Sequence, residues 1–145
     1  MRGKLRMIRQ GNMGGSGGFA RNMYEVVRGR DTPNGVEKSD YVLILDDDIL
    51  LESEGVLRAT AFADMCHTPS IVGGHMFDMY NKPLLNGYAE VVNPYRFLWG
   101  PIDGLGGVDF AERGLRSRPQ LHRRWDADYN GWWMCLIPRL SLIHI

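Results

Sequence analysis

The first half of the chain alternates between short apolar runs and stretches in which apolar residues recur at helical spacing. The clearest apolar run covers residues 41–45 and has the length of a buried strand. The pattern predicts strands over residues 5–9, 41–45 and 70–74, and helices over residues 19–29 and 52–66. This order of strand, helix, strand, helix and strand favours an α/β fold with a parallel, doubly wound sheet.

The second half of the chain has a looser pattern. Val91 and Val92 indicate a short antiparallel strand, residues 100–107 form a glycine-rich loop, and residues 132–137 predict a last buried strand that ends at Pro138. No internal repeat or domain boundary interrupts the chain. We therefore expect one domain over residues 1–140 followed by a short tail over residues 141–145.

The composition is that of an ordinary soluble globular protein. Seventeen basic residues balance 17 acidic residues, so no overall field favours nucleic acid or an anionic surface. The residues after Met1 lack the apolar stretch of a secretory signal, and no apolar run approaches the ~20 residues of a membrane span. Cys66 and Cys135 lack metal-type spacing and suit a reducing compartment. We expect a cytoplasmic protein, with peripheral membrane contact left open.

Three consecutive aspartates, Asp46, Asp47 and Asp48, directly follow the apolar run 41–45. Alternation along a strand would direct Asp46 and Asp48 to one side and Asp47 to the other. Two carboxylates on one side form a hard oxygen site suited to Mg²⁺ or Mn²⁺, which substrate phosphates and water usually complete. The competing interpretation is a solvated turn or a helix cap, but three carboxylates after a buried strand favour a cation site.

A glycine-rich run, residues 14–18, lies between a predicted strand and a predicted helix. Its backbone N–H groups at a helix start could hold an anion such as phosphate. Gly15, Gly17 and Ala20 also fit the dinucleotide-binding pattern G-x-G-x-x-G/A. That pattern expects one acidic residue after the second strand, whereas this chain has three, which would repel a diphosphate unless a cation bridged them. A metal-dependent phosphate site explains both features.

Three motifs in this order resemble the polymerising galactofuranosyltransferases, which build the galactan of mycobacterial-type cell walls. The motifs are residues 10–21 (Gln-Gly-Asn-Met-Gly-Gly-Ser-Gly-Gly-Phe-Ala-Arg), residues 45–49 (Leu-Asp-Asp-Asp-Ile) and residues 121–133, which end in Asn-Gly-Trp-Trp. Further similarity covers residues 71–74 and 89–92. The resemblance implies a GT-A (Rossmann-like) fold and an inverting transfer of galactofuranose from UDP-galactofuranose to a growing galactan.

The resemblance also implies a role for particular residues. Asp46 and Asp48 would bind a divalent metal, Mn²⁺ or Mg²⁺, that bridges the UDP diphosphate. The donor side of the pocket would comprise Gly14, Gly15, Gly17, Gly18, Arg21 and Asp47. The sugar and acceptor side would comprise Glu90, Trp99, Trp132 and Trp133, with core packing as the competing interpretation for at least one of the paired tryptophans.

The chain departs from the family in ways that bear on catalysis. Family members carry a uridine-binding strand upstream, and a catalytic base and a further metal-binding histidine downstream, and no position of this chain matches them. We therefore expect a glycosyltransferase domain truncated at both ends, without a catalytic residue of its own and inactive alone. Asn86 stands where a histidine is expected, and the tail 141–145 ceases to resemble the family.

Three alternatives to this function remain at this stage. One is a transferase for another nucleotide sugar. Another is a dinucleotide-dependent oxidoreductase, which would bind NAD(H) without a metal. The third is a non-catalytic carbohydrate-binding remnant, which would bind glycan through its tryptophans and ignore UDP. No feature of the sequence indicates a nucleic-acid partner.

Overall fold

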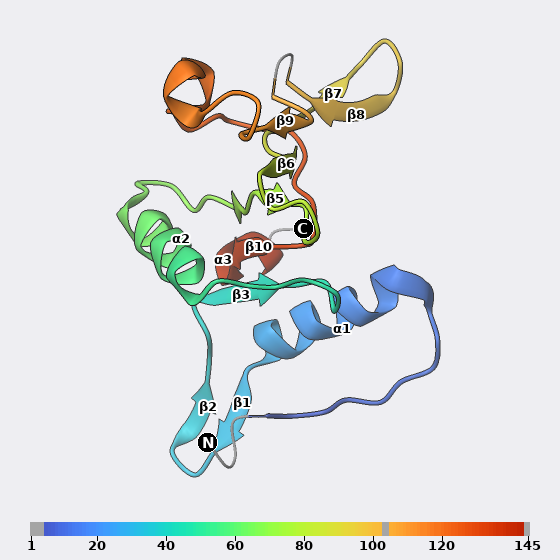
Figure 1. The fold of residues 1–145 in the computed structure, drawn as a ribbon. Helices are drawn as coiled ribbons and strands as arrows, with labels where there is room; N and C mark the ends of the chain where they lie inside the picture. The colour runs from blue at the N-terminus through green and yellow to red at the C-terminus, as the bar shows by residue number, and fades with distance from the viewer. Residues whose placement is uncertain (1–4, 103–104, 144–145) are drawn as a thin grey trace.

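The computed structural model describes residues 5–102 and 105–143 and has a mixed content of helices and strands (Figure 1). The elements are α1 (Gly14–Arg28), β1 (Arg30–Thr32), β2 (Gly35–Glu37), β3 (Tyr41–Ile44), α2 (Ser53–Met65), β4 (Val72–Gly73), β5 (Met76–Phe77), β6 (Leu84–Gly87), β7 (Glu90–Asn93), β8 (Leu98–Pro101), β9 (Val108–Asp109), the 3₁₀ turns η1 (Leu115–Ser117) and η2 (Pro119–Leu121), β10 (Cys135–Pro138) and α3 (Arg139–Ile143).

The central sheet has the strand order β3-β10-β4, and β10 runs antiparallel to both neighbours. Ile44 pairs with Cys135, and Cys135 pairs with Gly73 on the other side. The predicted parallel, doubly wound sheet is therefore wrong, because every strand pair among the described residues is antiparallel. β3 and β4 run in the same direction, but a strand from the far end of the chain separates them.

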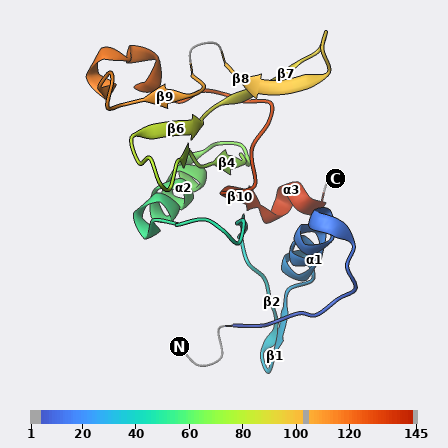
Figure 2. The same cartoon turned by 45° about the vertical axis from the view of Figure 1, so that its right-hand side comes forward.

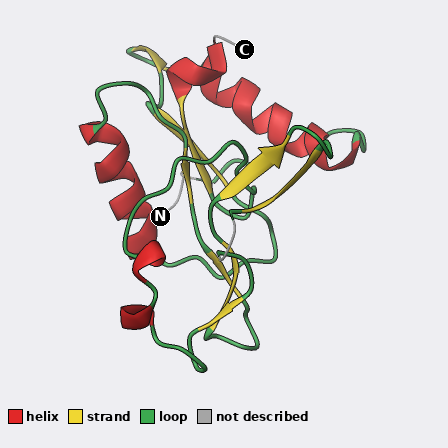
Figure 3. Ribbon diagram, turned by 90° about the horizontal axis from the view of Figure 1, so that it is seen from above, coloured by secondary structure: helices red, strands yellow, loops and turns green. Residues whose placement is uncertain are grey.

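Alternating side chains of this sheet build two apolar layers, one on each face. On one face Val42, Ile44, Cys135 and Ile137 pack against α1. On the other face Met134 and Leu136 pack against α2 through Ala59 and Ala63. The two helices thus cover opposite faces of the sheet, which Figure 3 shows from above. This arrangement confirms the mixed α/β content that the sequence predicted.

Several predicted elements are confirmed and one is wrong. The last strand, predicted over residues 132–137, begins three residues later as β10 and includes Pro138, which pairs with Tyr41. The strand at 41–45, the helix at 52–66 and the strand at 91–92 appear as β3, α2 and β7, and β7 pairs antiparallel with β8. The predicted strand at 5–9 is absent, since these residues have no regular secondary structure. The helix predicted from residue 19 begins earlier, at Gly14, so the glycine run is helical rather than a loop.

A second layer of structure stands over the central sheet and carries β5 to β9 and the two 3₁₀ turns (Figure 2). It connects to the sheet through Trp133, whose ring nitrogen donates a hydrogen bond of 2.8 Å to the Gly74 carbonyl oxygen. At the C-terminal end of the described chain, α3 contacts α1, and Leu142 packs against the α1 face of the sheet. Among the described residues, no helix has the length and apolar character to cross a bilayer.

Candidate functional site

The three aspartates lie just beyond the carboxyl end of β3. That strand ends at Ile44, and Asp47 and Asp48 form an exposed turn, while Asp46 is half-buried. Strand alternation therefore does not decide which aspartates share a side, because the extended strand has ended before them. None of the ion pairs found among the described residues uses these carboxylates. The three aspartates place negative charge at one end of the central sheet, just beyond the carboxyl end of β3.

Antiparallel pairing of β10 with β3 places the two consecutive tryptophans, Trp132 and Trp133, at this same end of the sheet. The register pairs Ile44 with Cys135, so the carboxyl end of β3 adjoins the amino end of β10. Trp132 and Trp133 lie in the turn just before β10, separated from it by Met134. The acidic segment after β3 and the turn that holds the tryptophans are therefore neighbouring backbone segments, although they are far apart in the sequence. This proximity of the acidic and aromatic segments is the central feature of the site.

The glycine-rich start of α1 joins the same region through an aromatic contact. The rings of Phe19 and Trp132 lie 4.3 Å apart, centroid to centroid, in an edge-to-face arrangement. Phe19 directly follows the glycine run 14–18, which forms the first turns of α1. The Asn12 side-chain oxygen accepts a hydrogen bond of 3.0 Å from the Gly14 N–H ahead of this helix. Of the glycines predicted for the donor side, Gly18 thus adjoins the residue that contacts Trp132.

Trp133 has mainly a structural role. Its ring packs beside the α2 face of the sheet and lies against Gly87, where an added Cβ atom would come within 3.1 Å of the ring. The core-packing interpretation therefore holds for Trp133. Trp132 keeps 37% of its surface exposed and is the member of the pair that is available to a ligand.

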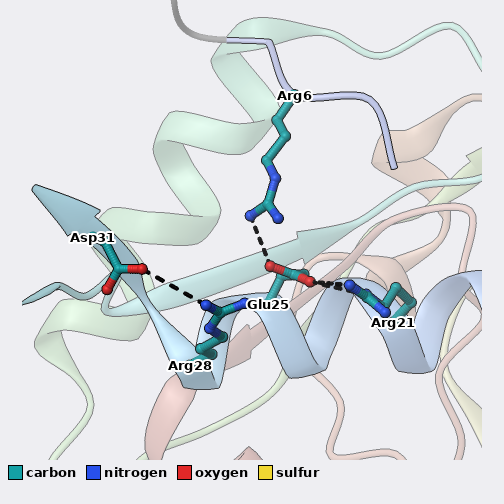
Figure 4. Close-up of polar contacts among 5 residues, drawn as sticks. All are labelled: Arg6, Arg21, Glu25, Arg28 and Asp31. Carbon is teal, nitrogen blue, oxygen red and sulfur yellow. Dashed lines mark hydrogen bonds and ion pairs between the residues drawn. The ribbon is translucent and has the colours of Figure 1, made fainter. Parts of the chain in front are cut away.

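Arg21, predicted on the donor side, is held by Glu25 in this structure (Figure 4). The Arg21 Nη2 atom lies 2.6 Å from Glu25 Oε1, and the Arg6 Nη1 atom lies 2.7 Å from Glu25 Oε2. Glu25 is largely covered, with 11% of its side chain exposed. Removal from water acts to raise the Glu25 pKa, but hydrogen bonds and charges from Arg21 and Arg6 outweigh this and lower it below 4.5.

The Glu25 cluster gives a pH-dependent prediction. Because the pKa of Glu25 is lowered in the folded state, its carboxylate stabilises the fold above pH ~4.5, and this contribution is lost as the pH falls further. We expect Glu25→Gln to lower the urea midpoint at pH 7 and the difference from the wild type to be smaller at pH 3. Asp31→Asn is the control, because it removes a carboxylate from an exposed ion pair. The Asp31 side chain is 81% exposed, and its Oδ2 atom lies 3.6 Å from Arg28 Nη2. An equal difference at both pH values contradicts the prediction.

Two of the predicted acceptor-side residues lie together in the second layer. Trp99 on β8 stacks on Tyr129 with ring centroids 5.2 Å apart, and Glu90 on β7 forms a β-bridge with Tyr129. The Glu90 carbonyl oxygen accepts hydrogen bonds from the N–H groups of Asp128 and Tyr129, at 3.0 and 3.2 Å. The Glu90 Oε2 atom is buried without a hydrogen-bond partner, and burial raises the pKa of this carboxyl group.

The chain segment from Tyr129 to Trp133 connects the two groups of predicted residues. Tyr129 stacks on Trp99 in the second layer. Trp132 lies at the end of the central sheet that also holds the aspartates. Sequence reasoning assigned no role to Tyr129 or Phe19, although both belong to motifs that carry the family resemblance. Their contribution depends on ring contacts between distant segments, which no local pattern indicates.

The basic segment after η2 is engaged within the protein. The His122 ring nitrogen Nε2 lies 2.7 Å from the Leu115 carbonyl oxygen, and Arg124 pairs with Asp126 at 3.0 Å. The Arg123 guanidinium lies over the Trp125 ring at 4.0 Å from its centroid. These contacts favour a structural role for His122, Arg123 and Arg124 over contact with a phosphate.

The residues at the acidic turn fit a divalent cation of the magnesium or manganese type. Within residues 5–102 and 105–143, no three His, Cys, Asp or Glu side chains close around a point as in an all-protein metal cage. Mg²⁺ and similar ions are usually held by one or two carboxylates, with substrate phosphates and water as the remaining ligands. The aspartates of the acidic turn form no ion pair within the described part of the chain, so their carboxylates are compatible with this kind of binding.

Sequence comparison relates this chain to glycosyltransferases. It is 37% identical over 142 residues to galactofuranosyltransferase GlfT2 of Mycolicibacterium smegmatis, and 40% identical over 141 residues to the GlfT2 protein of Mycobacterium tuberculosis. Each alignment covers 94% of this chain but 21% of the relative, so the chain spans about a fifth of the length of these curated relatives. No protein-family model matches. The resemblance identified from the sequence motifs is thereby confirmed.

Proposed function

We propose that this chain forms the donor-binding part of a galactofuranosyltransferase that uses UDP-galactofuranose and extends a galactan. The observation that carries the proposal is the antiparallel pairing of β10 with β3, which places Trp132 beside the acidic turn. A cation site next to an aromatic ring suits a sugar nucleotide, since the diphosphate requires positive charge and the sugar presents C–H surfaces to the ring. The extensive identity to two galactofuranosyltransferases supports the same donor.

Each group of residues has a distinct role in this proposal. Asp46 and Asp48 hold a divalent cation, Mn²⁺ or Mg²⁺, with Asp47 and the glycine run 14–18 beside the nucleotide. When bound, such a cation neutralises the charge that develops on the departing diphosphate. Trp132 contacts the sugar. We propose the GT-A arrangement for this nucleotide-binding part, with helices on both faces of the sheet in support.

The second layer is proposed to hold the acceptor glycan. Trp99 and Tyr129 offer stacked rings with 57% and 40% of their surfaces exposed, as sugar-binding platforms usually do. The buried, unpartnered Oε2 atom of Glu90 would accept a hydrogen bond from a sugar hydroxyl group. We propose that the base that deprotonates the attacking hydroxyl lies outside these 145 residues. The chain alone is then expected to bind without transferring sugar.

Calorimetric titration of the 145-residue chain with UDP, with and without Mn²⁺, tests the donor assignment. We expect UDP to bind more tightly in the presence of Mn²⁺, and UDP-galactofuranose to compete with it better than other UDP-sugars. Binding of NAD(H) without a metal, and no binding of UDP, would instead support a dinucleotide-dependent enzyme. Better competition by another UDP-sugar would change the donor but retain the class of transferase.

The aromatic pair gives a prediction for acceptor binding. Trp99→Ala is expected to weaken binding of a galactofuranose oligosaccharide about 3- to 10-fold, since one stacked aromatic contact contributes about 0.5–1.5 kcal/mol. Chemical-shift titration of the chain with the oligosaccharide measures this effect. Tyr95→Ala is the matched control, because Tyr95 lies in the turn that connects β7 to β8 and is 93% exposed. Equal weakening by both variants contradicts the role of Trp99.

A further inference from the structure

Glu25 on α1 is shared by two arginines that come from different segments of the chain. Its Oε1 atom accepts a hydrogen bond of 2.9 Å from Arg21 Nε and lies 2.6 Å from Arg21 Nη2, and its Oε2 atom lies 2.7 Å from Arg6 Nη1. Figure 4 shows the carboxylate between the two guanidinium groups. Each carboxylate oxygen thus has its own arginine. Since one negative charge meets two positive charges, the cluster has one positive charge in surplus.

The two arginines are not equivalent in position. Arg21 lies on α1, two positions after Phe19, whose ring contacts Trp132 at the end of the central sheet. Arg6 lies in the segment ahead of α1, which has no regular secondary structure. Only Arg21 therefore belongs to the helix that begins with the glycine run 14–18, where we place the nucleotide.

Arg6 reduces the cost of releasing Arg21 from Glu25. The Glu25 side chain is 11% exposed, and its lowered pKa keeps it charged at neutral pH. A covered carboxylate that loses its last cationic partner is strongly destabilised. Because Arg6 binds the second oxygen, Glu25 keeps one full counter-charge when Arg21 leaves. Without Arg6, the same departure would leave the carboxylate alone.

The surface of α1 ahead of Arg21 is free of side chains. Gly14 and Gly18 lie seven and three positions before Arg21, so they share its face of the helix. An added Cβ atom at either glycine would have no neighbour within 4 Å, so this surface is open. A helical side chain leans toward the start of its helix, which brings the open surface within reach of Arg21. In the structure the side chain instead turns toward Glu25, one turn further along α1.

We propose that Arg21 exchanges Glu25 for the diphosphate of a nucleotide bound at the glycine run, and that Arg6 is a positioning residue that stays on Glu25 and so permits the exchange. The proposal rests on the donor site proposed above, and it adds a residue that does not touch the nucleotide. Arginine suits such an exchange, since its planar guanidinium group donates two parallel hydrogen bonds to a carboxylate or to a phosphate. The negative diphosphate then balances the surplus positive charge of the cluster.

Calorimetric titration of UDP into the 145-residue chain, at pH 7 and fixed Mn²⁺, tests the exchange. Arg6→Ala is expected to weaken UDP binding about threefold or more, the effect of one partly exposed ion pair. Glu25→Gln is expected to bind UDP at least as tightly as the wild type, because an uncharged side chain no longer retains Arg21. When Arg6→Ala is added to Glu25→Gln, it is expected to have no further effect. A merely structural role of Arg6 would not depend on the charge of residue 25 in this way.

Arg28→Ala is the matched control for these variants. It removes one positive charge from α1 and breaks the exposed ion pair of Arg28 with Asp31, and it is expected to leave UDP binding unchanged. Near-ultraviolet circular dichroism at pH 7 shows that each variant is folded. Equal weakening by Arg28→Ala and Arg6→Ala would mean that overall charge explains the loss, and it overturns the proposal.

Three further outcomes overturn the exchange. These are an unchanged UDP affinity in Arg6→Ala, weaker UDP binding in Glu25→Gln, and an equal loss from Arg6→Ala whether residue 25 is glutamate or glutamine. Failure of the donor site is distinguishable from failure of the exchange. A wild-type chain that binds no UDP in the presence of Mn²⁺ overturns both, whereas equal UDP binding by the wild type and Arg6→Ala overturns the exchange alone.

Discussion

Asp46→Ala is expected to remove the Mn²⁺-dependent part of UDP binding, which we place at tenfold or more in affinity, or at least about 1.4 kcal/mol. The physical reason is that a small, hard cation at this site has few protein ligands, so the loss of one carboxylate removes a large share of them. Titration of UDP into the variant at fixed Mn²⁺ measures the loss. Asp48→Ala is expected to behave in the same way, and Asp47→Ala to have a smaller effect.

Asp40→Ala is the matched control for this experiment. Asp40 stands at the other end of β3, and its backbone oxygen, which accepts a hydrogen bond of 2.8 Å from the Arg139 N–H, survives the substitution. This variant removes one negative charge from the same strand without touching the acidic turn. A Mn²⁺ effect that persists in both Asp46→Ala and Asp48→Ala would disprove the cation site. Equal loss in Asp40→Ala would indicate a general effect of charge.

Gly131→Ala is expected to destabilise the protein by about 1–3 kcal/mol, the usual cost of overpacking a buried position. Gly131 is buried, and a Cβ atom added to it would overlap the ring of Trp133. The tryptophan has little freedom to move, since its ring nitrogen is bound to the Gly74 carbonyl oxygen at 2.8 Å. Urea unfolding followed by near-ultraviolet circular dichroism measures both the stability and the tryptophan environment.

Gly55→Ala provides the comparison of opposite sign. Gly55 lies in α2, and an added Cβ atom would have no neighbour within 4 Å. Alanine in a helix is favoured over glycine, so this variant should be more stable by about 0.5–1 kcal/mol. If both variants shift stability in the same direction, the packing of Trp133 against Gly131 does not explain the first result.

The local elements of this protein could be predicted from the sequence because each has a local cause. α2 follows from apolar residues at helical spacing and begins within a residue of the predicted start. The glycine run was not expected to be helical, because glycine disfavours helices by about 1 kcal/mol per residue. The structure nevertheless starts α1 at Gly14, and packing of Phe19 against Trp132 supports that end of the helix.

The roles of the candidate site residues divide in a similar way. The sequence predicts a cation site at the acidic turn from three aspartates after a buried run, and the motifs alone indicated the resemblance that sequence comparison confirms. The sequence Trp-Trp does not show that the two side chains differ in burial. Trp132 is exposed at the end of the sheet, whereas Trp133 packs beside the core. The stacking of Trp99 on Tyr129 is not evident from the sequence either, since these residues come from separate segments.

The sequence by itself determined where the main helices lie and which enzymes the chain resembles, and from it we predict which residues bind a cation or a sugar. The tertiary structure alone decided that β10 enters between β3 and β4 in the opposite direction, which joins the tryptophans to the acidic turn. Periodicity reports how a strand distributes its side chains but not which strand it pairs with. That choice depends on burying both faces of the sheet beneath α1 and α2, and the contacts responsible come from opposite ends of the chain.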